Sequence, residues 1–275
     1  MMTFGTYDSS EWRETSNSFE YVSSKPTIKT PTDSVKLFAD KMCIPQNSAG
    51  INRPRLIAHL EKSLEQFSAT LVTGRAGTGK TTLAADFARQ TSYDIAWYKV
   101  ETTDSDWKVF LSYFAESLRQ SRLDCQPSKI FSLEQNDKTE NLSVTESLAA
   151  QFATIENEKP LLIVIDDLHS VFDAEWFPEF FNALLSLRTQ NVQLLLLART
   201  APPFPLWRLR SKQILGMMDE KLLAFNPEET IELFAQYGLD AKAALAANKL
   251  AYGRICKLKQ IAEERCVKEK LLQRH

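Results

Sequence analysis

The sequence has few of the residues that build metal sites or disulfide frameworks. Its 275 residues include three histidines and four cysteines, and the cysteines are scattered rather than grouped in Cys-x-x-Cys pairs. With so few His residues, no zinc site can be written with normal ligand spacing. The pattern predicts reduced thiols in a cytoplasmic protein.

Long apolar runs are also missing. The longest, Leu161–Ile165 and Leu194–Ala198, fall far short of the roughly 18 to 20 residues that a membrane helix needs. The N-terminus lacks the basic segment and apolar core of a secretory signal. We therefore expect a soluble protein with no membrane contact.

Charge of one sign does not dominate either. The formal net charge of -2 excludes nucleic-acid binding driven by the field of the whole chain. The length allows one α/β domain with a small addition, and a hydrophobic content of 44% is enough for a buried core.

Glycine is scarce, yet three of the eight glycines fall within six residues. They belong to Gly74-Arg75-Ala76-Gly77-Thr78-Gly79-Lys80-Thr81, which fits the pattern of Gly, any four residues, Gly-Lys and then Ser or Thr. The β-prone run Ala69–Val72 precedes this loop, and Thr81–Ala88 has helical spacing after it. Strand, glycine loop and helix in this order predict a phosphate-binding site.

The chemistry of such a site accounts for the residue types. Backbone N–H groups at a helix N-terminus form a positively polarised cradle, and glycine lets the backbone curl around β- and γ-phosphates. Lys80 adds a charge on the phosphates, and Thr81 offers a hydroxyl to Mg²⁺. A loop whose glycines only make a turn would leave this Lys-Thr pair unexplained. We expect ATP or ADP to be held by Gly74, Arg75, Ala76, Gly77, Thr78, Gly79, Lys80, Thr81 and Thr82.

Two acids follow the apolar run Leu161–Ile165, which is typical of a strand buried on both faces of a parallel sheet. Ligands bind at the carboxyl edge of such sheets. We expect Asp166 to bind Mg²⁺ and Asp167 to orient or activate the attacking water. The alternative is a solvated strand end or a helix cap. His169 is either a contact of the γ-phosphate or a surface or packing residue.

A further strand, Val192–Ala198, ends at Arg199. This position resembles the polar sensor of the AAA+ class, in which the strand between the phosphate-loop strand and the acidic strand carries a side chain towards the γ-phosphate. The resemblance makes Arg199 the candidate sensor. In the alternative interpretation, Arg199 caps the strand or pairs with an acid.

The alternating strands and helices predict an α/β fold, a P-loop NTPase parallel sheet flanked by helices, with a small C-terminal helical lid. Residues 1–40 lack periodicity and are expected to be mostly disordered, followed by the NTPase domain over 41–222 and the lid over 223–275. The other predicted elements are a helix from Arg53, a strand over Ile95–Val100, helices over Trp107–Leu118 and Phe177–Leu187, a loop over 121–140, a helix over Val144–Ile155, and lid helices near 227–237, 240–251 and 254–274.

In this order the motifs resemble the nucleotide-binding module of the STAND subclass of AAA+-related ATPases, specifically the MalT-like family of bacterial transcription regulators. The resemblance spans about residues 41–262 and is carried by the phosphate loop, Arg53-Pro54-Arg55-Leu56, Ile165-Asp166-Asp167-Leu168-His169 and Pro202-Pro203-Phe204-Pro205-Leu206-Trp207-Arg208-Leu209-Arg210. It implies a switch that binds ATP and Mg²⁺, holds ADP when inactive, and couples nucleotide state to association with itself or with a partner protein.

Two departures from the family pattern stand out. Family members usually carry Gly-x-Pro in the lid, and here Gly253-Arg254-Ile255 has Ile in place of Pro. The sequence contains no winged helix, helical repeat array or helix-turn-helix before its last residue, so no DNA-binding element is expected in this chain.

Three functions fit these observations. The first is a slowly hydrolysing ATP switch in which Lys80, Asp167 and Arg199 act on the phosphates and the water. The second is a nucleotide-dependent binding scaffold with negligible turnover. The third, a small-molecule kinase, would use the same loop but needs an acceptor motif that the sequence does not show.

Overall fold

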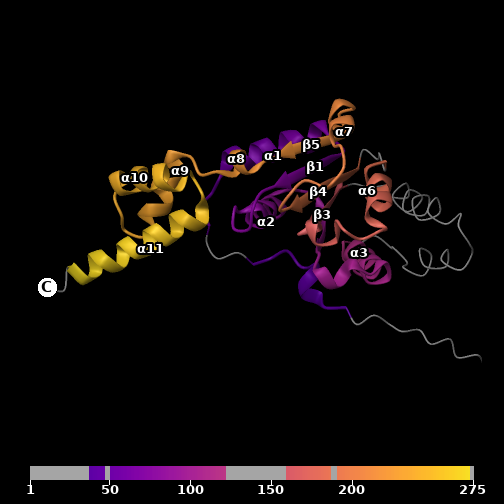
Figure 1. Cartoon of the computed structure of the whole chain (residues 1–275), viewed down its shortest axis with the longest axis horizontal. Coiled ribbons are helices and arrows are strands. Elements are labelled where there is room, and N and C mark those ends of the chain that lie inside the picture. The colour runs from indigo at the N-terminus through magenta and orange to yellow at the C-terminus, as the bar shows by residue number, and fades with distance from the viewer. Residues whose placement is uncertain (1–36, 47–49, 122–158, 187–190, 273–275) are drawn as a thin grey trace, which may run out of the picture. The chain divides into compact units, whose positions relative to one another are not determined.

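The computed structural model describes residues 37–46, 50–121, 159–186 and 191–272 (Figure 1). All of them belong to the second of two compact units, Val35–His275, whereas the first, Met1–Ser34, lies outside the described residues. The predicted lead-in, the loop over 121–140 and the helix over 144–155 also lie outside them, except for residues 37–40 and Ser121.

A parallel sheet forms the centre of the α/β part. Its described strands are β1 Ala69–Thr73, β2 Asp94–Lys99, β3 Leu161–Asp166, β4 Val192–Ala198 and β5 Leu215–Met218. They lie in the order β2-β3-β4-β1-β5, and every neighbouring pair is parallel. This order confirms the predicted α/β fold and puts β4 between the phosphate-loop strand and the acidic strand.

Helices cover both faces of this sheet, namely α1 Pro54–Gln66 and α2 Lys80–Gln90 on one face and α3 Trp107–Gln120 and α6 Phe177–Ser186 on the other. Alternate residues of a strand point to opposite faces. Accordingly, Val164 of β3 packs in the cluster of α1 and α2, and its neighbour Ile163 packs in the cluster of α3 and α6. Because both faces are covered, every residue of β3 is buried, which explains its unbroken apolar run.

The C-terminal helices form a group with a core of its own. They are α9 Pro227–Ala235, α10 Ala241–Ala251 and α11 Ile255–Leu272, close to the predicted positions. Their apolar side chains pack together, and Phe225 and Ile51 join the same cluster. A capping box starts α9, because Asn226 accepts a bond from the Glu229 N–H and Glu229 accepts one from the Asn226 N–H.

Several short elements were not predicted from the sequence. They are the 3₁₀ turns η1 Ala39–Met42, η2 Thr102–Ser105 and η3 Leu168–Val171, the helices α7 Trp207–Ser211 and α8 Glu220–Leu223, and the edge strand β5. In β5, Gly216 has no side chain to contribute to the alternating pattern that identifies a strand in the sequence. Glycine is explained there by packing against another element. A Cβ added there would overlap Ser63 Oγ of α1, so glycine lets that helix approach the strand.

No helix within the described ranges is both long and apolar enough to cross a membrane.

Arg53 and Arg55, at the start of α1, bind Glu229 of α9. Arg53 Nη2 lies 3.2 Å from Glu229 Oε2, and Arg55 Nε donates to Oε1 at 2.9 Å. The same guanidinium groups donate to the carbonyls of Leu223 at 2.7 Å and Ala224 at 2.6 Å. The Arg53 and Glu229 side chains are only 10% and 7% exposed. This buried cluster attaches the helical group to the α/β part.

The cluster also sets the ionisation of Glu229. Burial raises the pKa of Glu229, but the hydrogen bonds from Arg55 and Arg53, the charge of Arg53 and the bond from the Asn226 N–H together outweigh it, so that the pKa lies below its usual value. A lowered carboxyl pKa stabilises the folded state above the unfolded pKa, and this stabilisation is lost as the pH falls through the folded pKa.

Replacing Glu229 by Ala should lower the free energy of unfolding by roughly 3 kcal/mol, because it leaves a buried guanidinium without its anion. Urea unfolding at neutral pH measures this loss. Glu228→Ala, at an exposed position of the same helical turn, is the matched control and should change stability little. Equal losses in the two variants would show that the cluster does not stabilise the protein.

Candidate functional site

The predicted phosphate loop connects β1 to α2, as the sequence indicated. Two of its glycines have positive φ angles, 75° at Gly77 and 90° at Gly79, which L side chains rarely adopt. A Cβ added to Gly74 would lie 2.9 Å from Thr78 Oγ1. The backbone conformation thus requires glycine at Gly77 and Gly79, the closeness of Thr78 favours it at Gly74, and the loop curls in front of the α2 N-terminus.

Lys80, the first residue of α2, turns back over the loop. Its Nζ donates to the carbonyls of Gly74 at 2.6 Å and Arg75 at 3.1 Å, and the residue is only 6% exposed. Burial lowers the pKa of Lys80, and the nearby charges of Asp167 and Asp166 oppose this effect. An ammonium group held among carbonyls inside the loop is suited to bind an anion there.

The acidic strand meets the phosphate loop through one hydrogen bond. Thr81 Oγ1 donates to Asp166 Oδ2 at 2.9 Å, and the Asp167 N–H donates to Asp166 Oδ1 at 2.9 Å. Asp166 is fully buried. Burial raises the pKa of Asp166 to about 6, with a further contribution from the charge of Asp167. A hydroxyl and a carboxylate in contact are oxygen ligands of the kind that Mg²⁺ prefers, so the two side chains fit that ion.

Asp167 adopts a left-handed conformation, with φ 54° and ψ 32°, at the residue before η3. A non-glycine residue in this region is strained, and such strain concentrates at functional sites. His169 Nδ1 lies 3.8 Å from Asp167 Oδ1 and is a buried atom with no hydrogen-bond partner among the described residues. Burial lowers the pKa of His169, so its ring is neutral at pH 7.

Arg199 follows the last residue of β4, between the ends of β1 and β3. Its positive charge acts on both Lys80 and His169, lowering the pKa of each. No ion pair of Arg199 is found among the residues that the structure describes. Arg199, Thr78 and Arg75 line one cavity of about 540 Å³.

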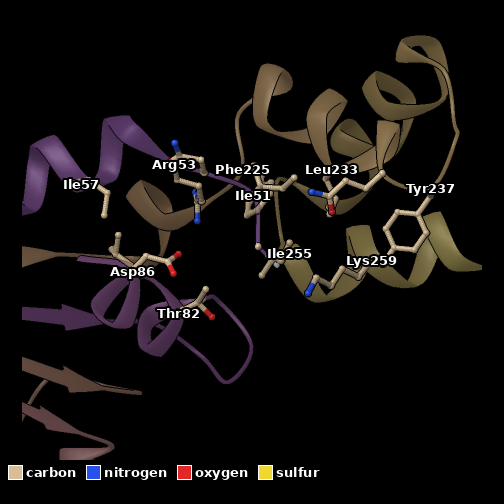
Figure 2. Close-up of a pocket in the computed structure, with 15 residues that line it drawn as sticks. Ile51, Arg53, Ile57, Thr82, Asp86, Phe225, Leu233, Tyr237, Ile255 and Lys259 are labelled. Carbon is tan, nitrogen blue, oxygen red and sulfur yellow. The ribbon is translucent and has the colours of Figure 1, made fainter. Parts of the chain in front are cut away.

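A second cavity, of about 230 Å³, opens between α2 and the helical group (Figure 2). Its apolar lining includes Ile51, Phe225 and Ile255, and Thr82 of the predicted set reaches it from α2. The Arg53 guanidinium stacks on the Phe225 ring at 4.2 Å, and Arg53 Nε is buried without a partner among the described residues. The cavity is therefore walled mainly by apolar side chains beside a buried arginine, a lining typical of ligand sites.

The carboxyl edge of the sheet thus brings together residues that lie far apart in the sequence. Lys80 and Thr81 come from the end of β1, Asp166 and Asp167 from the end of β3, and Arg199 from the end of β4. Within the loop, Arg75 pairs with Glu220 of α8, and Ala76 is exposed.

Most residues that line the apolar cavity were not predicted from the sequence. Arg53 stood out there only as part of a helix start and of the family resemblance, and Ile51 and Phe225 had no predicted role. The sequence carried no signal for this role of Arg53, because its burial depends on the distant Glu229 and Phe225. Ile255 was noted as the residue that replaces the lid proline, whereas these other lining residues were not foreseen: Gly50, Ile51, Asn52, Arg53, Ile57, Leu83, Asp86, Phe225, Leu233, Gln236, Tyr237 and Lys259.

The raised pKa of Asp166 predicts a pH-dependent stability. A folded pKa of about 6, above the model-peptide value of 3.8, gives stability that is present below about pH 4 and lost as the pH rises through 6. Asp166→Asn stays neutral and keeps the shape of the side chain. Without metal, the variant should therefore be more stable than the wild type at pH 8, on the order of 2 kcal/mol, and similar near pH 4.

Urea unfolding in EDTA between pH 4 and 8 tests this, with the exposed Asp173→Asn as the control for a surface carboxylate. If the wild type and Asp166→Asn showed parallel pH curves, Asp166 would not be a costly buried charge.

Comparisons with known proteins agree with this geometry. The AAA ATPase domain family matches residues 52–197, more than half of the chain. The HTH-type transcriptional regulator MalT of Vibrio cholerae is 28% identical over 200 residues, which cover 73% of this chain and 22% of that protein. MalT of Serratia proteamaculans is 33% identical over 184 residues, or 66% of this chain and 20% of that protein. The chain thus spans about a fifth of the length of these curated relatives.

Among solved structures, the Walker-type ATPase of Pyrococcus abyssi matches with a TM-score of 0.47 and 13% identity, over 81% of this chain and 73% of that chain. This likeness is too weak to support a functional argument. The match over residues 52–197 coincides with the strand order, the phosphate loop and the acidic strand described above. The chain belongs to the AAA ATPase domain family, and MalT regulators are among its relatives.

Proposed function

We propose that this chain is an ATP-binding regulatory switch that hydrolyses ATP slowly with Mg²⁺. The observation that carries the proposal is the contact between Thr81 of the phosphate loop and the buried Asp166, with Lys80 beside them. Membership in an ATPase domain family supports the choice of nucleotide. The names of the relatives support a regulatory role.

In this proposal each group has one task. The backbone N–H groups of residues 75–81 and the Lys80 ammonium bind the phosphates. Thr81 and Asp166 would hold Mg²⁺, which when bound would neutralise phosphate charge. Asp167 orients the attacking water through its carboxylate, and Arg199 senses the terminal phosphate from the neighbouring strand.

We place the adenine ring of the nucleotide in the apolar cavity. Ile51, Phe225 and Ile255 offer apolar walls of the kind that bind a flat ring, and Arg53 lines the same cavity. We assign residues 41–222 to the NTPase domain and 223–275 to the lid. A nucleotide bound across both would then favour one arrangement of the lid over another, which is what a switch requires.

The regulatory output lies beyond the chain itself. The chain covers only about a fifth of the MalT regulators that it matches. We propose that nucleotide state controls association of this module with itself or with a partner protein, and through that association transcription, in a cytoplasmic setting.

Lys80→Ala should weaken binding of MgATP and MgADP by about 10- to 100-fold, because it removes a charged hydrogen-bond donor from the phosphates. Isothermal calorimetry measures both affinities. The exposed Lys62→Ala of α1 removes the same charge from the surface and should bind like the wild type. Unchanged affinity in Lys80→Ala would refute the assignment of the site.

Asp167→Asn should lower the single-turnover rate of ATP hydrolysis by about 10²- to 10⁴-fold while leaving ATP affinity nearly unchanged, because the carboxylate acts on the water and not on the nucleotide. Asp173→Asn is the matched surface control. If the wild type itself binds ATP without measurable turnover, the chain is a nucleotide-dependent scaffold, and Asp167 has no catalytic role.

A further inference from the structure

Glu220 has no role in the proposed chemistry, yet it lies directly beside the phosphate loop. It is the first residue of α8, after Asp219, whose side chain caps that helix by accepting a bond from the Leu222 N–H at 3.1 Å. A Cβ added to Gly74 would come within 3.5 Å of Glu220 Cβ. Glu220 thus lies within van der Waals reach of the loop at Gly74.

On the loop side, Glu220 binds Arg75 through several bonds. Arg75 Nε donates to Oε2 at 3.0 Å, Nη2 lies 3.0 Å from Oε1, and the Arg75 N–H donates to Oε2 at 3.3 Å. The planar guanidinium thus meets the carboxylate side by side, the geometry that favours arginine over lysine. Hydrogen bonds from Arg75 hold the pKa of Glu220 below its usual value, so the carboxylate is charged at neutral pH.

On the lid side, Glu220 faces Arg254, in the turn between α10 and α11. Arg254 Nε lies 3.7 Å from Glu220 Oε1. The turn is fixed in place, because the Phe225 N–H donates to the Gly253 carbonyl at 2.8 Å. Beside it, Cys256 Sγ donates to the Gly77 carbonyl of the phosphate loop at 3.0 Å. The start of α11 thus approaches the loop at two points, and Glu220 mediates one of them.

We propose that Glu220 is a positioning residue that ties the start of α11 to the phosphate loop and so transmits the occupancy of the loop to the lid. One carboxylate is shared by Arg75 and Arg254, which without it would face each other as like charges. Both arginines also line the cavity that contains Thr78 and Arg199. A phosphate anion bound there competes with Glu220 for the two guanidinium groups and loosens the tie. This inference rests on the proposed function, because it names the step by which nucleotide reaches the lid.

The exposure of these side chains suits an adjustable contact. The Arg75 side chain is 65% exposed, Arg254 51% and Glu220 28%, so water and salt screen the pair. A contact of this kind is weak enough for a competing anion to displace. By contrast, the Glu229 cluster at the other attachment of the lid is buried and remains fixed.

Amide hydrogen exchange of α11 tests the proposal, in the full chain with and without MgADP. In the nucleotide-free protein, Glu220→Gln should speed exchange at residues 259–262 by about two- to fivefold, the range expected for an exposed ion pair. The nucleotide-induced change at these amides should shrink, while MgADP affinity by calorimetry stays within about threefold of the wild type. Glu232→Gln, an exposed lid carboxylate, is the matched control and should leave all three quantities unchanged.

A double-mutant comparison shows whether the effect runs through Arg254. Glu220→Gln and Arg254→Gln together should exchange no faster than either alone, and additive effects would overturn the tie. Faster exchange in Glu220→Gln with a full nucleotide response would overturn the coupling. The exchange rates measured without nucleotide do not depend on whether the proposed function is correct. If the wild type bound no nucleotide, the proposed function would fail and this inference with it, whereas the exchange data would still report the contact itself.

Discussion

The hydrogen bond from Thr81 to Asp166 is the contact on which the site depends, because it joins the phosphate loop to the acidic strand. The two strands that carry these residues are not neighbours, since β4 lies between them. The contact therefore exists only if β1, β4 and β3 are correctly ordered and in register. It also lies where a charged group loses hydration on folding, because Asp166 is fully buried and Lys80 is nearly so.

This burial has an electrostatic consequence. The sheet offers Asp166 one hydroxyl and one N–H, and the raised pKa shows that these two bonds do not offset desolvation. Lys80 is the corresponding buried cation. Its ammonium group donates to a backbone carbonyl, and burial lowers its pKa. A magnesium-bound polyphosphate would place a cation beside Asp166 and phosphate oxygens beside Lys80. The folded protein thus holds two buried ionisable groups of opposite sign side by side, as the proposed binding of a magnesium nucleotide requires.

The two attachments of the helical group to the α/β part differ in how deeply their ion pairs are buried. Glu229 binds Arg53 and Arg55 in a buried cluster, where breaking one partner leaves an unpaired charge. Glu220 binds Arg75 and faces Arg254 near the surface, where the pair is screened. The first behaves as a fixed point and the second as an adjustable one. This difference is the basis of our proposal that the lid moves about its buried attachment while its other end responds to the phosphate loop.

The sequence alone determined the elements with strong local patterns. The glycines of the phosphate loop, the apolar run before Asp166 and the Asn226-Pro227 start of α9 predicted their elements correctly, because each rests on backbone geometry, burial period or capping within a few residues. It also identified Lys80, Thr81, Asp166, Asp167 and Arg199 as one candidate set, since the ends of parallel strands share one edge of a sheet.

Only the tertiary structure decided the remainder. The four-residue β5 has no readable period, and Gly216 is explained by the approach of α1 rather than by any neighbour in the sequence. The pairing of Arg53 with Glu229 and of Arg75 with Glu220 joins residues more than a hundred positions apart, and no local pattern around an arginine identifies so distant a partner. Local propensity predicts where chain segments fold, whereas ion pairs and cavity walls arise only after distant segments have packed together.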